Sequence, residues 1–166
     1  MGNYVYWAGD STVKTNNITT YPQTGIGQVM GLYFQEDVTT INHAENGRST
    51  KSFIDEQRLA TIYNDIRPGD FLFIQFGHND SKVDDSTRYT EPFGDYQVNL
   101  EKFINVARNR HAYPVLITPV CRRWFTNDVT LDQDIHGDYP EAMTEVAERL
   151  EVPIIDLYSS SRKMIE

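Results

Sequence analysis

The sequence predicts an α/β protein built on a parallel sheet, and two features indicate this class. Short apolar runs alternate with longer stretches whose apolar residues recur at helical spacing, as in repeated strand–helix–strand units. The run at 70–77 (DFLFIQFG) is almost entirely apolar, which is typical of a strand buried on both faces. Helical crossovers make successive strands parallel. A length of 166 residues suits one domain with a single core.

Five strands are expected, each a short run of mainly apolar residues. They are the segments 4–8, 38–42, 71–76, 114–118 and 152–156. Three stripes of apolar side chains predict helices that pack on the sheet. Their members are Ile54, Leu59, Ile62, Tyr63 and Ile66; Tyr96, Leu100, Phe103, Ile104 and Ala107; and Met143, Val146, Ala147 and Leu150. A last helix is expected after 154–158 (IIDLY).

Composition limits the partners of the chain. The formal net charge of −9 argues against a nucleic-acid or anionic-membrane partner, because both need clustered Lys and Arg. The single cysteine, Cys121, excludes a disulfide framework, and no apolar run approaches the ~20 residues of a membrane span. No leader is apparent, so the sequence as written predicts a cytoplasmic protein; a secreted protein whose leader was removed is the alternative.

Small polar residues follow the expected strands. Gly9-Asp10-Ser11 follows the first strand, Asn46-Gly47-Arg48-Ser49 the second and Gly77-His78-Asn79-Asp80 the third. Ligands of parallel α/β sheets bind beyond the carboxyl ends of the strands. Each motif is common by itself, but their order and shared placement indicate one functional crevice.

The residues in this crevice suit acyl transfer. A serine hydroxyl attacks a carbonyl when a base takes its proton and hydrogen-bond donors stabilise the oxyanion. The backbone amides of Ser11 and Gly47 and the side-chain amide of Asn79 are candidate donors, supplied by three different loops. The simpler interpretations are a capping serine, a turn glycine and a loop asparagine that bonds to backbone.

Together the motifs resemble the GDSL-type, or SGNH, hydrolases, and within them the rhamnogalacturonan acetylesterase-like branch. The resemblance runs from Tyr4 to about Leu157 through AGDST, TGIGQ, NGRSTKSF, FGHND, TPVCRR and HGDYPEAM. It implies a flavodoxin-like three-layer fold with strand order 2-1-3-4-5. It also implies a metal-free serine esterase that removes acetyl groups from pectic or other plant-derived sugars. By this resemblance Ser11 is the nucleophile, and Ser11, Gly47 and Asn79 form the oxyanion hole.

One element of the family pattern is missing. The family's Asp-x-x-His block, which supplies the general base and its orienting acid, occurs nowhere in the chain. We therefore expect a domain over 1–166 that is truncated at its C-terminal side and is poorly active alone. Truncation would expose apolar surface beside the fifth strand and the last helix, which predicts self-association.

Three further residues are candidates for substrate binding. His78 adjoins Asn79 and is assigned a structural or substrate-side role rather than that of the base. Arg122 and Trp124 follow the fourth strand, where Trp124 can stack on a sugar ring; an ordinary surface role is the alternative. No histidine or cysteine spacing matches a zinc site, and no nucleotide-binding motif occurs, so no metal and no cofactor are expected.

The expected substrate is a small-molecule or oligosaccharide acetyl ester. Two other functions remain open from the sequence. A non-catalytic carbohydrate-binding or scaffold protein on the same fold is one, and a lipid ester or thioester hydrolase is the other.

Overall fold

The computed structural model describes residues 3–127, 130–131 and 136–166. It contains a parallel sheet of five strands in the order β2-β1-β3-β4-β5, which confirms the predicted fold class and strand order. The strands are β1 (Tyr4–Gly9), β2 (Thr39–Asn42), β3 (Phe71–Gln75), β4 (Tyr113–Ile117) and β5 (Ile154–Ile155). Four lie within one residue of the predicted bounds, whereas β5 is only two residues long, against five predicted.

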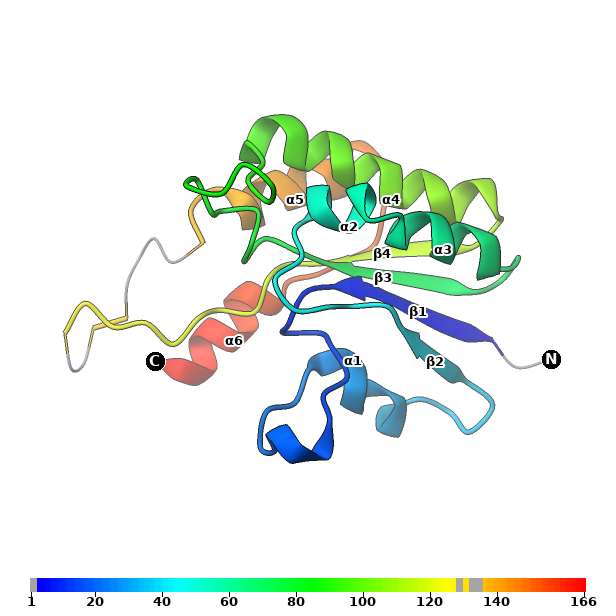
Figure 1. Ribbon diagram of the computed structural model, residues 1–166, viewed down its shortest axis with the longest axis horizontal. Coiled ribbons are helices and arrows are strands. Elements are labelled where there is room, and N and C mark those ends of the chain that lie inside the picture. The colour runs from blue at the N-terminus through cyan, green and yellow to red at the C-terminus, as the bar shows by residue number, and fades with distance from the viewer. Residues whose placement is uncertain (1–2, 128–129, 132–135) are drawn as a thin grey trace.

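Helices cover both faces of the sheet (Figure 1). The helices on one face are α2 (Thr50–Asp55), α3 (Arg58–Asp65), α4 (Gln97–Asn109) and α5 (Tyr139–Arg149). Those on the other face are α1 (Ile26–Val29) and α6 (Leu157–Ile165). Three further short helical segments are η1 (Ile18–Thr20), η2 (Met30–Tyr33) and η3 (Pro92–Tyr96).

The predicted helical stripe from Ile54 to Ile66 is divided between two helices. α2 begins with a capping box, in which Ser49 and Ser52 bond each other's backbone amides, and it ends at Asp55. Gln57 then adopts the left-handed conformation with φ of 61°, and α3 starts at the next residue. Most of the stripe packs on the core as predicted, but it spans two helices rather than one, because apolar spacing alone does not reveal a left-handed residue between them.

The two faces of the sheet differ in how completely they are covered. Leu72, Ile74 and Leu116 point to the four-helix face and are fully buried. Alternate residues point to the other face, where Tyr113 is 57 % exposed and Ile155 is 48 % exposed. Ile155 is thus a partly exposed apolar residue on β5; self-association through this side stays a prediction that light scattering would test.

No helix in the described ranges is both long and apolar enough to cross a bilayer.

Candidate active site

The first loop of the site carries Ser11. β1 ends at Gly9, where a Cβ would lie 2.6 Å from Val13 Cγ2 and 2.9 Å from Gln75 O, so only glycine permits this close approach. The carboxylate of Asp10 accepts hydrogen bonds from the Thr12 backbone amide (2.8 Å) and the Thr12 hydroxyl (2.7 Å). Ser11 lies between them, partly exposed, and its hydroxyl bonds to no group in the described part of the chain.

The second loop carries Gly47. Its φ is +72°, in the left-handed region that favours glycine. The nearest atom to a Cβ built there is Arg88 Nη1, at 3.6 Å, which is an ordinary contact. Conformation rather than space therefore makes glycine suitable at this position.

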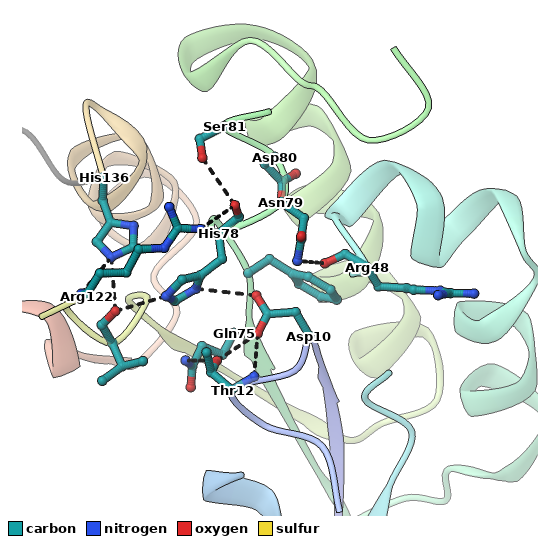
Figure 2. A network of polar contacts seen from close by, with 12 residues as sticks. Asp10, Thr12, Arg48, Gln75, His78, Asn79, Asp80, Ser81, Arg122 and His136 are labelled. Carbon is teal, nitrogen blue, oxygen red and sulfur yellow. Dashed lines mark hydrogen bonds and ion pairs between the residues drawn. The ribbon is translucent and has the colours of Figure 1, made fainter. Parts of the chain in front are cut away.

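The third loop carries Asn79, whose side chain joins it to the second loop (Figure 2). Asn79 Nδ2 donates to the backbone oxygen of Arg48 at 3.1 Å, and Asn79 Oδ1 accepts from Arg88 Nη1 at 3.2 Å. β2, β1 and β3 are neighbours in the sheet, so the three loops leave adjacent strands at the same edge. The structure thus brings the loops of Ser11, Gly47 and Asn79 together.

Asp80 ties the same two loops together in the protein interior. It is fully buried and accepts from the Thr50 backbone amide (3.0 Å), the Thr50 hydroxyl (2.5 Å) and the Thr90 hydroxyl (2.9 Å). No cation among the described residues pairs with it. Burial raises the pKa of Asp80 to about 7, although the bonds from Thr50 and Thr90 act in the opposite direction.

In the view of Figure 2, the ring of His78 lies on one side of Asp10 and Arg48 on the other, and both ring nitrogens of His78 face acceptors. Nδ1 is 3.4 Å from Asp10 Oδ2, and Nε2 is 3.1 Å from Val120 O. Neither ring nitrogen of His78 makes a hydrogen bond with Ser11 in the described structure. Burial would raise the pKa of Asp10, but the hydrogen bond and charge of His78, with the bonds from Thr12, bring it below its usual value.

His136 packs edge-on against His78, with ring centroids 4.6 Å apart. Its Nε2 is 3.0 Å from Val120 O and 3.3 Å from the Arg122 amide nitrogen. We assign the proton to Nε2, because the carbonyl only accepts and its contact is the shorter one. Nδ1 is then a buried acceptor without a partner among the described residues. Burial, with the nearby His78 and Arg122, lowers the pKa of His136 to about 3.

Arg122 and Trp124 line a groove of about 510 Å³ beside His136. Arg122 Nη2 donates to His78 O at 2.9 Å, and its guanidinium lies 6.0 Å from the centre of the Trp124 ring. The indole of Trp124 is 62 % exposed, whereas His78 is 5 % exposed and does not line the groove. Of the three substrate-binding candidates, the geometry thus favours Arg122 and Trp124 for contact and His78 for support.

The other two histidines lie elsewhere. The ring of His43 stacks on Tyr6, with centroids 6.0 Å apart, and burial lowers its pKa. His111 follows α4 at the opposite edge of the sheet, with a φ of 56°. Within the described residues, no group of three or more His, Cys, Asp or Glu side chains is placed to hold a metal ion.

Sequence reasoning missed Asp80 and Arg88 as parts of this site. Asp80 belongs to the Gly-His-Asn-Asp motif, but nothing in the motif shows that its carboxylate binds Thr50, thirty residues away. Arg88 lies in a polar loop without periodicity, so no pattern distinguishes it from other surface arginines.

Comparison with known proteins identifies the family of the chain. Residues 8–164 match the model of the GDSL-like Lipase/Acylhydrolase family. The chain is 44 % identical over 161 residues to the probable rhamnogalacturonan acetylesterase YesY of Bacillus subtilis, covering 97 % of this chain and 73 % of that protein. It is 43 % identical over 162 residues to the rhamnogalacturonan acetylesterase RhgT of the same organism, covering 98 % and 68 %.

A solved structure, that of YxiM from Bacillus subtilis, superposes with a TM-score of 0.84 at 25 % identity. The match covers 99 % of this chain but 46 % of that one, so the chain spans less than half the length of this structural relative. The family match spans nearly the whole chain, and the loops that it includes carry the three predicted site residues. The chain therefore belongs to the GDSL-like lipase/acylhydrolase, or SGNH, family and is by class a serine ester hydrolase.

Proposed function

We propose that this chain carries the acyl-transfer site of an esterase that removes acetyl groups from O-acetylated carbohydrate of the rhamnogalacturonan type. The convergence of the Ser11, Gly47 and Asn79 loops at the edge formed by β2, β1 and β3 carries the proposal. The names of YesY, a probable rhamnogalacturonan acetylesterase, and of RhgT, a rhamnogalacturonan acetylesterase, support the substrate class.

In the proposed reaction Ser11 Oγ attacks the acetyl carbonyl and loses its proton to a base. The amides of Ser11 and Gly47 and the side chain of Asn79 donate hydrogen bonds to the oxyanion. Collapse of the tetrahedral intermediate breaks the ester bond, releases the sugar hydroxyl with the proton from the base, and leaves acetyl-Ser11. Water then attacks this ester and releases acetate, and the proton returns to Ser11.

The base that takes the Ser11 proton is assigned from the contacts of the histidines. His78 faces Asp10 and Val120, His136 faces Val120, and neither makes a hydrogen bond with Ser11. We therefore assign the base to a histidine that is not among the four of this chain. If the base lies outside this chain, Ser11 of the chain alone is acetylated slowly, and the acetyl-Ser11 intermediate is hydrolysed slowly.

The test follows the acetyl group. The chain and Ser11→Ala are incubated with p-nitrophenyl acetate and with acetylated rhamnogalacturonan, and protein mass and released acetate are measured. A slow acetyl adduct on Ser11 with little turnover is the expected result. An adduct that persists in Ser11→Ala would contradict the nucleophile, and fast turnover that depends on Ser11 would contradict the missing base.

Neither His78 nor His136 makes a hydrogen bond with Ser11, and this also favours a second function, that of a carbohydrate-binding protein without catalysis. The groove with the exposed Trp124 is the feature that would serve it. Calorimetric binding of a deacetylated oligosaccharide, together with no acetyl adduct on Ser11, would favour this alternative.

A further inference from the structure

Arg88 contacts one of the proposed oxyanion donors and lies beside another. Its Nη1 donates to Asn79 Oδ1 at 3.2 Å. The same nitrogen is the nearest atom, at 3.6 Å, to a Cβ built on Gly47. One guanidinium thus lies next to two groups supplied by two different loops.

The position of this guanidinium is set within its own loop. Arg88 Nε donates to Asp85 Oδ2 at 2.7 Å, and the backbone amide of Arg88 donates to Asp85 O at 3.0 Å. Asp85 Oδ1 accepts from the Thr87 amide (3.0 Å) and the Thr87 hydroxyl (2.5 Å), which closes the turn. These bonds, with that from Arg88, hold the pKa of Asp85 below its usual value, so the carboxylate stays charged as the partner of Arg88.

The contact determines which end of the Asn79 amide faces which loop. A guanidinium only donates, so it selects Oδ1, and the Arg48 carbonyl only accepts, so it selects Nδ2. Without Arg88, Oδ1 loses its partner, and only the bond from Nδ2 to the Arg48 carbonyl still opposes rotation of the amide. An amide turned end for end would present an acceptor to the oxyanion instead of a donor.

The guanidinium also borders open space. Arg88 lines a cavity of about 620 Å³ together with Gly47, Lys51, Ser86 and Thr87, and about a third of its side chain is exposed. Arg48 and Lys51 also line this cavity, and the ammonium of Lys51 pairs with Asp55 at 2.9 Å. The cavity therefore offers a matched control for the loss of positive charge.

We infer that Arg88 is a positioning residue of the oxyanion hole, which holds the side-chain amide of Asn79 with its NH₂ group directed toward the acyl site. This inference rests on the proposed function for its catalytic consequence. The contact itself can be tested without catalysis.

The first experiment uses NMR. The side-chain NH₂ resonances of Asn79 are assigned by their loss in Asn79→Asp and are compared in the wild-type chain, Arg88→Met and Lys51→Met. We expect Arg88→Met to shift these resonances and to speed their exchange with water, and Lys51→Met to leave them unchanged. Unchanged Asn79 resonances in a folded Arg88→Met chain would overturn the inference, whatever the activity.

The second experiment measures the rate of Ser11 acetylation by p-nitrophenyl acetate and by an acetylated oligosaccharide. We expect Arg88→Met to slow acetylation by both about 10-fold at saturation, less than the roughly 10²–10³-fold loss of a whole donor. Arg88→Lys, which keeps the charge but loses the fork that spans Asp85 and Asn79, should recover only part of the rate. Lys51→Met should match the wild type.

The remaining outcomes separate the two proposals. A different result would be that Arg88→Met only raises the oligosaccharide concentration needed for half-maximal acetylation and leaves the saturating rate unchanged. That result would make Arg88 a substrate-binding residue and overturn its positioning role. An unchanged acetylation rate with shifted Asn79 resonances would also overturn it. If the wild-type chain and Ser11→Ala show the same absence of adduct, the proposed function fails, and the NMR comparison still decides whether Arg88 holds Asn79.

Discussion

The two sides of the Ser11 loop differ in how their polar groups are satisfied. On the side of Gly47, Asp80 joins two loops through three donors, and Asn79 has a partner at each end of its amide. On the other side, His78 and His136 converge on the single carbonyl of Val120, and a buried nitrogen of His136 lacks a partner in the described structure. Hydrogen-bond donors are thus organised on one side, and a proton acceptor for Ser11 is not organised on the other.

The largest effect on the rate of Ser11 acetylation is expected from the loss of the Asn79 side chain. Asn79→Ala removes one oxyanion donor and should slow the acetylation of Ser11 by about 10²–10³-fold, as measured by the mass of the protein after timed exposure to p-nitrophenyl acetate. Asn109→Ala, at the end of α4 near the opposite edge of the sheet, is the control. Equal rates for both variants would remove Asn79 from the site.

Asp80, on the Gly47 side of the Ser11 loop, should make the free energy of unfolding depend on pH. Its pKa is raised to about 7 in the folded protein, against about 4 when unfolded. The folded state binds the proton more tightly, so the stabilising contribution is full below pH 4 and is lost as the pH rises to 7. Asp80→Asn should remove this contribution, so its free energy of unfolding, measured by urea denaturation at several pH values, should rise more steeply with pH than that of the wild type. A slope unchanged in Asp80→Asn would show that another group causes it.

His136, on the other side of the loop, should make the free energy of unfolding depend on pH with the opposite sign. Its pKa is lowered to about 3, so the unfolded chain binds a proton below about pH 6.5 while the folded chain does not. Stability is therefore present above pH 6.5 and is lost as the pH falls toward 3. His136→Gln keeps a donor for Val120 O without the titration and should remove this acid loss in the same urea experiment. The contributions of Asp80 and His136 offset each other in the wild type, so the two variants should diverge between pH 4 and 6.5.

The smallest effect is expected at Gly47. Alanine there must adopt a φ of +72°, which costs about 1–2 kcal/mol of stability but meets no close atom. Gly69→Ala is a matched control, since its φ is +90° with nothing within 4 Å, far from the site. Both should lower the free energy of unfolding similarly in urea, while only Gly47→Ala should also slow Ser11 acetylation. A similar slowing in Gly69→Ala would mean that general destabilisation, not the Gly47 amide, is responsible.

The sequence by itself determined the strand–helix alternation, the strand order that the family resemblance implied, and the positions of Ser11, Gly47 and Asn79 at strand ends. Apolar periodicity and motif order carry that information, because they are local properties of the chain. Only the tertiary structure decided that Gln57 divides a helix and that Asp80 binds Thr50. It also decided that Arg88 holds Asn79 and that two histidines share Val120 O. Those contacts join residues between nine and 42 positions apart, and their partners are chosen by how the loops pack over the edge of the sheet, which no local pattern encodes.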